Sequence, residues 1–223
     1  MTNTLNKETV SKPKMRGWLH AGAAPVALLA GIILVLVAPP AYRLAIAIYV
    51  LCTVILFSTS AVYHRGNWKP RTKAILQRAD HSAIFLLIAG TYTPVAVILV
   101  HGTQQTTMLL LAWAGAGIGI SLRMLPKAPL WLFVAAYLLL GLAAAMYTPT
   151  ILQNGGVLIL GLIITGGILY ITGSVVFSLQ RPNPSIRWFA FHEIFHSFTL
   201  GAWAAQYIGI LLAAVGTAAV VTS

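Results

Sequence analysis

The sequence predicts an all-α membrane protein, a bundle of seven transmembrane helices with a cytoplasmic N-terminus and an external C-terminus. Composition is the first observation: 59% of the 223 residues are hydrophobic and 8% are charged, whereas a soluble domain has roughly 25% charged residues. The mean hydropathy of +0.87 agrees. The other two observations are the spacing of the apolar runs and the placement of the basic residues.

Seven apolar runs are long enough, at about 20 residues each, to cross the hydrocarbon core of a bilayer. Stretches rich in Pro, Gly, Asn and charge separate them, which is typical of loops. We expect spans at residues 18–38, 44–63, 81–100, 106–122, 129–148, 157–178 and 191–216. Residues 1–15 then form a cytoplasmic tail, and residues 16–223 form the transmembrane domain.

Basic residues fall almost entirely on one side of this arrangement. Arg43 stands alone on the other side. Because cytoplasmic loops carry an excess of Lys and Arg, this asymmetry fixes the predicted orientation. It also explains the net charge of +11 without a nucleic-acid partner, so we expect membrane lipids as partners. The residues on the basic side are Lys7, Lys12, Lys14, Arg16, Arg65, Lys69, Arg71, Lys73, Arg78, Arg123, Lys127, Arg181 and Arg187.

Polar side chains from three spans meet at one depth, near the cytoplasmic side. Ionisable residues inside a membrane are costly unless they are paired or functional, so such a cluster marks a candidate site. The second span ends with two of them, the third begins with two, and the seventh begins with two more. In chain order they are Ser60, His64, Asp80, His81, His192 and His196.

These residues predict a zinc site. His192 and His196 are four residues apart, which places both imidazoles on one face of a helix. His64 completes a three-histidine set with a fourth position open to water, as in catalytic zinc sites. Asp80 is then placed to hold or deprotonate that water, and Ser60 to hydrogen-bond it or an oxygen of the substrate.

Other readings of the same polar residues remain. Two histidines in a membrane helix can also link helices or relay protons. We expect His20 and His81 at the interface or behind the ligands, and His101 in a solvated external loop. Gly115 and Gly119 have the spacing of close helix packing.

The motifs together resemble the hemolysin III-like branch of the progestin and adipoQ receptors. They are SxxYH at the end of the second span, RADHSAIF followed by AGTYTP in the third, and HEIFH in the seventh. The resemblance implies zinc held by His64, His192 and His196, with Asp80 and Ser60 beside the metal-bound water. It also implies a multi-pass protein of the bacterial inner (plasma) membrane that acts in lipid homeostasis.

A wider similarity to alkaline ceramidases implies hydrolysis of a lipid amide. A membrane sensor with a structural zinc is the alternative, since Asp80 can instead close the fourth position. HEIFH also matches the H-E-x-x-H motif of metalloproteases, with Glu193 as base. In that reading Asp80 is the only candidate for the further acidic ligand that such a site needs. Otherwise we expect Glu193 to meet Arg187 or another basic residue of a loop. A pore-forming toxin has little support in a chain of resident spans.

Overall fold

The computed structural model describes residues 12–125 and 129–221, and this part of the chain is almost entirely helical, without β-strands. Lys7 and Lys127, and most of the expected tail, lie outside the described residues. The α-helices are α1 (Trp18–Val37), α2 (Arg43–Arg65), α3 (Pro70–Leu99), α4 (Gly102–Met124), α5 (Leu130–Leu142), α6 (Thr148–Leu179) and α7 (Phe191–Val221). Two short 3₁₀ helices, η1 (Pro40–Tyr42) and η2 (Ala143–Tyr147), precede α2 and α6.

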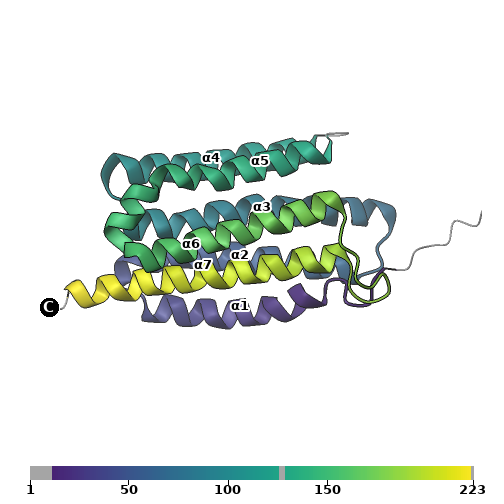
Figure 1. The fold of residues 1–223 in the computed structure, drawn as a ribbon, viewed down its shortest axis with the longest axis horizontal. Helices are drawn as coiled ribbons and strands as arrows, with labels where there is room; N and C mark the ends of the chain where they lie inside the picture. The colour runs from purple at the N-terminus through teal and green to yellow at the C-terminus, as the bar shows by residue number, and fades with distance from the viewer. Residues whose placement is uncertain (1–11, 126–128, 222–223) are drawn as a thin grey trace, which may run out of the picture.

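The helices lie side by side along one long axis of the molecule (Figure 1). α1 packs against α2 and α7, α3 packs between α2 and α4, and α6 packs along α7. α4 and α5 form an outer layer over α3 and α6 (Figure 1). The core is centred on α2 and α3: Tyr49 and Phe57 of α2 and Phe85 of α3, which faces α4 and α5, are almost fully buried.

Six stretches of the described chain are long and apolar enough to cross a membrane. Five of them correspond to α1, to η1 with α2, and to α3, α4 and α7. The remaining one, Trp131–Leu179, contains α5, η2 and α6. The chain reverses direction at η2, so α5 and α6 run antiparallel (Figure 1).

Two helices begin earlier than the sequence suggested. α3 starts at Pro70 rather than near residue 81, because proline suits the first helical position and the following residues are good helix formers. α6 starts at Thr148, inside the stretch expected as a loop, but its backbone breaks at Gly156 (φ 74°, ψ 174°). The Asn-Gly-Gly signal therefore marks a kink.

Tyr92 ties α3 to the end of α5. Its hydroxyl lies 2.7 Å from the carbonyl oxygens of Leu140 and Gly141, and it accepts a hydrogen bond from the Ala144 N–H at 2.7 Å. These contacts occupy backbone groups where the α-helix gives way to η2. Tyr92 belongs to the TYTP motif, so this motif positions the α5–α6 turn.

The glycines of α4 are packing positions, as their spacing predicted. A Cβ atom at Gly119 would lie 2.2 Å from the Phe85 ring of α3, and one at Gly115 would lie 2.5 Å from Leu140 of α5. α4 thus approaches both neighbours closely through residues without side chains.

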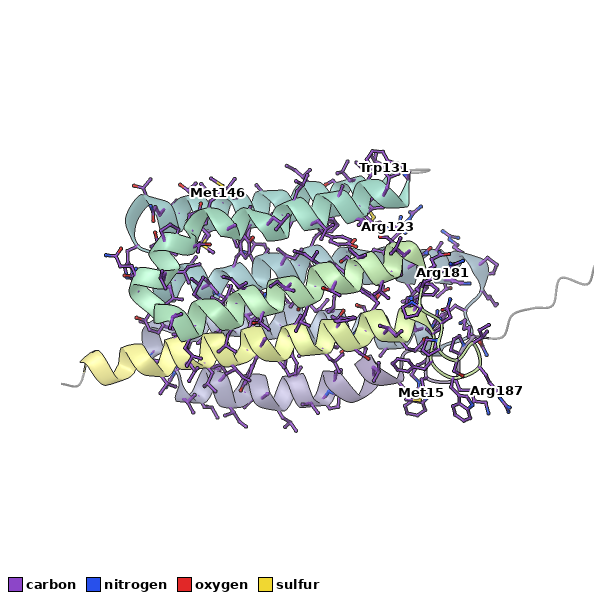
Figure 2. All side chains as sticks on the ribbon, viewed as in Figure 1. Met15, Arg123, Trp131, Met146, Arg181 and Arg187 are labelled. Carbon is purple, nitrogen blue, oxygen red and sulfur yellow. The ribbon has the colours of Figure 1, made fainter. Side chains whose placement is uncertain are left out.

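Basic side chains gather at one end of the bundle, which we call the basic end. Arg123, Arg181 and Arg187 lie there, whereas Met146 lies at the opposite end (Figure 2). The end of α2, the start of α3 and the start of α7 also lie at the basic end, and these segments carry the polar residues of the candidate site.

Candidate metal centre

Helices α2 and α7 bring three histidines together at the basic end. His64 lies in the last turn of α2, and His192 and His196 occupy the first two turns of α7. One ring nitrogen of each lies within 4.8 Å of the others. The Nε2 atoms of His64 and His192 are 3.0 Å apart, close to the roughly 3.3 Å that separates two nitrogens bound to tetrahedral zinc at 2.0–2.1 Å. The donor set therefore fits a metal ion.

The three rings converge at tilted angles. The angle between ring planes is 70° for His64 and His192, 64° for His64 and His196, and 55° for His192 and His196. Ligands of one tetrahedral ion approach it from different directions with the ion in the plane of each ring. Mutually tilted rings are compatible with this requirement, whereas stacked rings are not.

Asp80 and Ser60 lie beside the histidines, as expected from their depth. Asp80 Oδ2 is 3.6 Å from His64 Nε2. Ser60 lies one turn before His64 on the same face of α2, is 2% exposed, and makes no hydrogen bond within the part of the chain that the structure describes. Both residues line the same cavity as the three histidines. Their side chains are therefore available to a molecule bound there.

Glu193 forms an ion pair and is not available as a catalytic base. Its carboxylate is 1% exposed and pairs with the Arg16 guanidinium. Its second oxygen accepts a hydrogen bond from the Ala190 N–H at 2.9 Å, which caps the start of α7. Glu193 has a basic partner as expected, but the partner is Arg16 of the segment before α1 and not Arg187. Both carboxylate oxygens are occupied, which leaves the metalloprotease reading without its base.

His81 and His20 both reach the cavity. Arg123 Nε donates a hydrogen bond to His81 Nδ1 at 3.0 Å, so His81 is neutral and carries its proton on Nε2. His20 is 3% exposed and stacks on His196. It therefore lies behind a candidate ligand and not at the interface. His101 is exposed before α4, as predicted.

A cavity of about 380 Å³ extends from the histidines into the bundle, within the range of about 300–1,000 Å³ typical of small-molecule sites. Ser60, His64, Asp80, His192 and His196 line one end. Side chains of α3, α5, α6 and α7 line the remainder, as far along α7 as Gln206. The candidate metal centre is thus the polar end of a long internal space.

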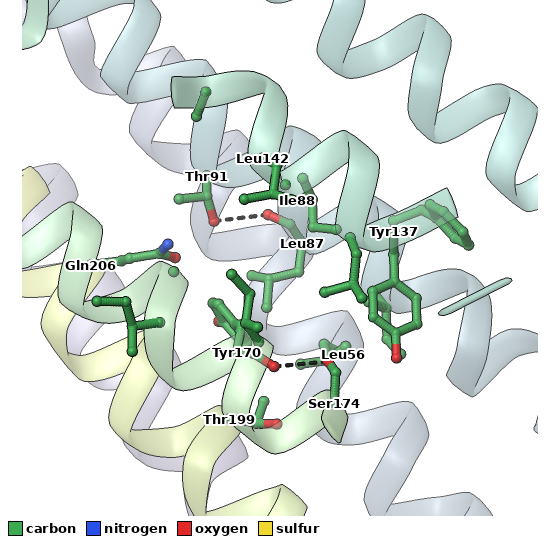
Figure 3. A pocket seen from close by; sticks show the side chains of 18 of the residues that line it. Leu56, Leu87, Ile88, Thr91, Tyr137, Leu142, Tyr170, Ser174, Thr199 and Gln206 are labelled. Carbon is green, nitrogen blue, oxygen red and sulfur yellow. Dashed lines mark hydrogen bonds between the residues drawn. The ribbon is translucent and has the colours of Figure 1, made fainter. Parts of the chain in front are cut away.

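The remainder of the cavity wall is mostly apolar, apart from the Tyr137 and Tyr170 hydroxyls and the Gln206 amide (Figure 3). Thr91, Ser174 and Thr199 line it, but their hydroxyls donate to the carbonyls of Leu87, Tyr170 and Phe195 on their own helices. A side chain that hydrogen-bonds its own helix offers little to a ligand. Leucine and isoleucine side chains lie between these residues (Figure 3). Such a wall suits hydrocarbon.

Sequence reasoning located the three histidines, Asp80 and Ser60, but it missed the contributions of α1 and the segment before it. Arg16 and His20 stand at the start of the first span, at the same end of the bundle as Glu193 and His196. A buried acid in a span also needs a basic partner at its own depth. Those two facts together could have paired Glu193 with the N-terminal segment.

The fold and this site define an integral, multi-pass helical membrane protein with a three-histidine cluster at one end of an apolar cavity. A family model described as haemolysin-III related matches residues 8–207. The chain belongs to this family, as the motifs predicted. It is 34% identical over 158 residues to "Hemolysin-3 homolog" of Bacillus subtilis (strain 168), covering 70% of this chain and 71% of the relative. It is 29% identical over 180 residues to "Hemolysin-3" of Bacillus cereus, covering 78% and 77%.

Proposed function

We propose that this protein is a zinc-dependent hydrolase of membrane lipid amides that acts in lipid homeostasis in the bacterial inner membrane. The observation that carries the proposal is the position of three converging histidines at the polar end of an apolar cavity. Metal chemistry and a space for hydrocarbon are thereby combined in one site.

Zinc is the metal that this donor set favours. Neutral imidazoles suit zinc, and three protein ligands with one position free are the arrangement of catalytic zinc sites. When bound, zinc supplies an activated water and polarises a carbonyl group. His64, His192 and His196 hold the ion in this proposal.

Asp80 and Ser60 carry the remaining chemistry. Asp80, 3.6 Å from His64 Nε2, accepts the proton of the attacking water and passes it to the departing amine. The Ser60 hydroxyl has no partner among the described residues and donates to the substrate carbonyl oxygen. Both roles require these groups to face the cavity, which they line.

The substrate enters from the bilayer between α5 and α6. Leu142, Ile164 and Ile168 line the cavity and are 53%, 45% and 57% exposed. Phe85 and Met108 line the same cavity but are only 1% exposed. Lining the cavity is therefore not enough to make a side chain solvent-exposed. The exposure of the first three therefore favours an opening to the apolar surface of the bundle.

The proposal places seven spans in the membrane, with the N-terminus cytoplasmic. α5 and η2 together run from Leu130 to Tyr147, close to the length of about 20 residues that a span needs. Arg43 is the one described basic residue at the opposite end from the others. By the positive-inside rule the basic end, and with it the zinc, faces the cytoplasm.

A membrane sensor with a structural zinc is the second candidate. It is favoured by the position of Asp80, whose carboxylate is near enough to His64 to become a fourth ligand after a small side-chain rotation. A closed four-ligand site would tie α2, α3 and α7 together without hydrolysis.

Fatty acid release separates the two candidates. Wild type and Asp80→Asn, each zinc-loaded in lipid nanodiscs, are given a panel of N-acyl lipids that includes ceramide. The hydrolase predicts release by wild type, loss after zinc removal, and at least a hundredfold slower release by Asp80→Asn with its zinc retained. Full zinc content without release from any lipid, together with zinc loss in Asp80→Asn, favours the sensor.

A further inference from the structure

His20 reaches the site from α1, a helix that supplies none of the three candidate ligands. Its ring is parallel to the His196 ring, with centroids 3.8 Å apart and 3° between the planes. Phe57 packs against it with a centroid distance of 5.0 Å. His20 also lines the polar end of the cavity. It is therefore held against the metal centre by packing on His196 and Phe57.

Neither ring nitrogen of His20 has a hydrogen-bond partner among the described residues, and both are shielded from solvent. A neutral imidazole carries one N–H donor and one acceptor nitrogen. Buried polar groups in native proteins are almost always paired, because an unpaired one forfeits its hydration without compensation. Protein atoms cover both nitrogens, so a partner can reach them only from the cavity that His20 lines, after a small shift of the neighbouring side chains.

The stacked geometry excludes His20 as a ligand of the same ion. A metal binds imidazole in the plane of the ring at about 2.0–2.1 Å from nitrogen. Stacked rings stand a van der Waals contact apart, roughly 3.5 Å. An ion in the plane of His196 is thus too far from the plane of His20 to bind its nitrogens. The partner of His20 is a non-metal atom beside the ion.

We propose that His20 is a binding residue for the polar group of the molecule that occupies the three-histidine site. Its ring hydrogen-bonds an oxygen or N–H of that molecule, as a hydroxyl or amide offers, and it does not bind the metal. The inference deepens the proposed function and rests on it, because it assigns to α1 the recognition of the lipid's polar group.

Acetohydroxamic acid tests this role. It binds metal through its oxygens, offers further hydrogen-bonding groups, and has no alkyl chain, so the apolar wall does not contribute. His20→Phe keeps an aromatic ring to stack on His196 but removes both nitrogens. His20→Gln keeps a donor and an acceptor but removes the ring. Tyr49→Phe is the matched control, because it removes another buried, unpartnered polar group that does not line the cavity.

We measure zinc per chain and the dissociation constant of acetohydroxamic acid for zinc-loaded wild type and each variant in detergent. All four proteins should hold one zinc. Loss of one hydrogen bond should weaken binding by His20→Phe about 5- to 10-fold, His20→Gln should recover part of this loss, and Tyr49→Phe should match wild type. If His20→Phe does not fold, His20→Ala replaces it, and weaker binding by His20→Ala than by His20→Gln carries the same meaning.

The inference is overturned if zinc-loaded wild type and His20→Phe bind acetohydroxamic acid equally, if zinc-loaded wild type does not bind it, or if Tyr49→Phe is weakened as much. Loss of zinc from His20→Phe to the extent seen in His196→Ala would make His20 a ligand and overturn it as well. Failure of the proposed function has a different signature, since wild type itself would then contain no zinc.

Discussion

Arg16 and Glu193 lie 177 residues apart in the chain and form an ion pair at the start of α7. Glu193 directly follows His192, so the pair anchors the start of α7, whose first two turns carry two of the candidate ligands. The backbone reinforces this contact: the N–H groups of Lys14 and Met15 donate to the carbonyls of Arg187 and Trp188. The segment before α1 is thereby fixed across the loop before α7.

Removing one member of this pair should destabilise the protein more than removing both. Arg16→Met leaves the Glu193 carboxylate buried without a counter-charge, at a cost of about 3 kcal/mol. Arg16→Met/Glu193→Met removes that charge and should recover part of the loss. Thermal unfolding in detergent measures both. A double-mutant cycle completed with Glu193→Met tests the coupling. If the loss in the double variant equals the sum of the losses in the two single variants, the two side chains are not coupled.

Gly119 and Gly117 provide a matched comparison on α4. Gly119→Ala places a methyl group against Phe85, which must shift, so the melting temperature should fall, by an amount corresponding to about 1–3 kcal/mol. A Cβ at Gly117 has nothing within 4 Å, and Gly117→Ala should be neutral or stabilising by up to about 1 kcal/mol. A loss at position 117 equal to that at 119 would contradict the packing of α4 on α3.

Tyr92→Phe should loosen the turn between α5 and α6. The substitution leaves the Ala144 N–H and the Leu140 and Gly141 carbonyls without their partner, which should cost about 1–3 kcal/mol. Hydrogen exchange should increase at residues 140–147. Tyr147→Phe is the control, because the Tyr147 hydroxyl makes no hydrogen bond within the described part of the chain. Unchanged exchange in Tyr92→Phe would show that the hydroxyl does not hold this turn.

Much of the fold follows from the sequence because a membrane imposes simple rules on it. Apolar length identifies the helices, and loop residues separate them. The boundaries of α3 and α6 were missed for a physical reason: a helix does not end where its apolar run ends. The largely polar segment from Pro70 to Asp80 extends α3 before its apolar run, and two helical segments meet at the Gly156 kink within α6.

The candidate site was predictable to the extent that depth in the membrane is predictable. His64, Asp80 and His192 were expected together because each lies at the same end of its span. The rotation of each helix about its axis is set by packing, which one sequence does not reveal. For that reason the stacking of His20 on His196 and the pairing of Glu193 with Arg16 emerged only from the structure.

Metal content per chain tests the central claim most directly. Elemental mass spectrometry is applied to detergent-purified wild type, His64→Ala, His192→Ala and His196→Ala, prepared without added zinc. His101→Ala is the control, since it changes an exposed histidine outside the cluster. About one zinc per chain is expected in wild type and in His101→Ala, and at least a tenfold lower content in each of the three ligand variants. Folded wild type without metal, or zinc retained in all three ligand variants, would contradict it.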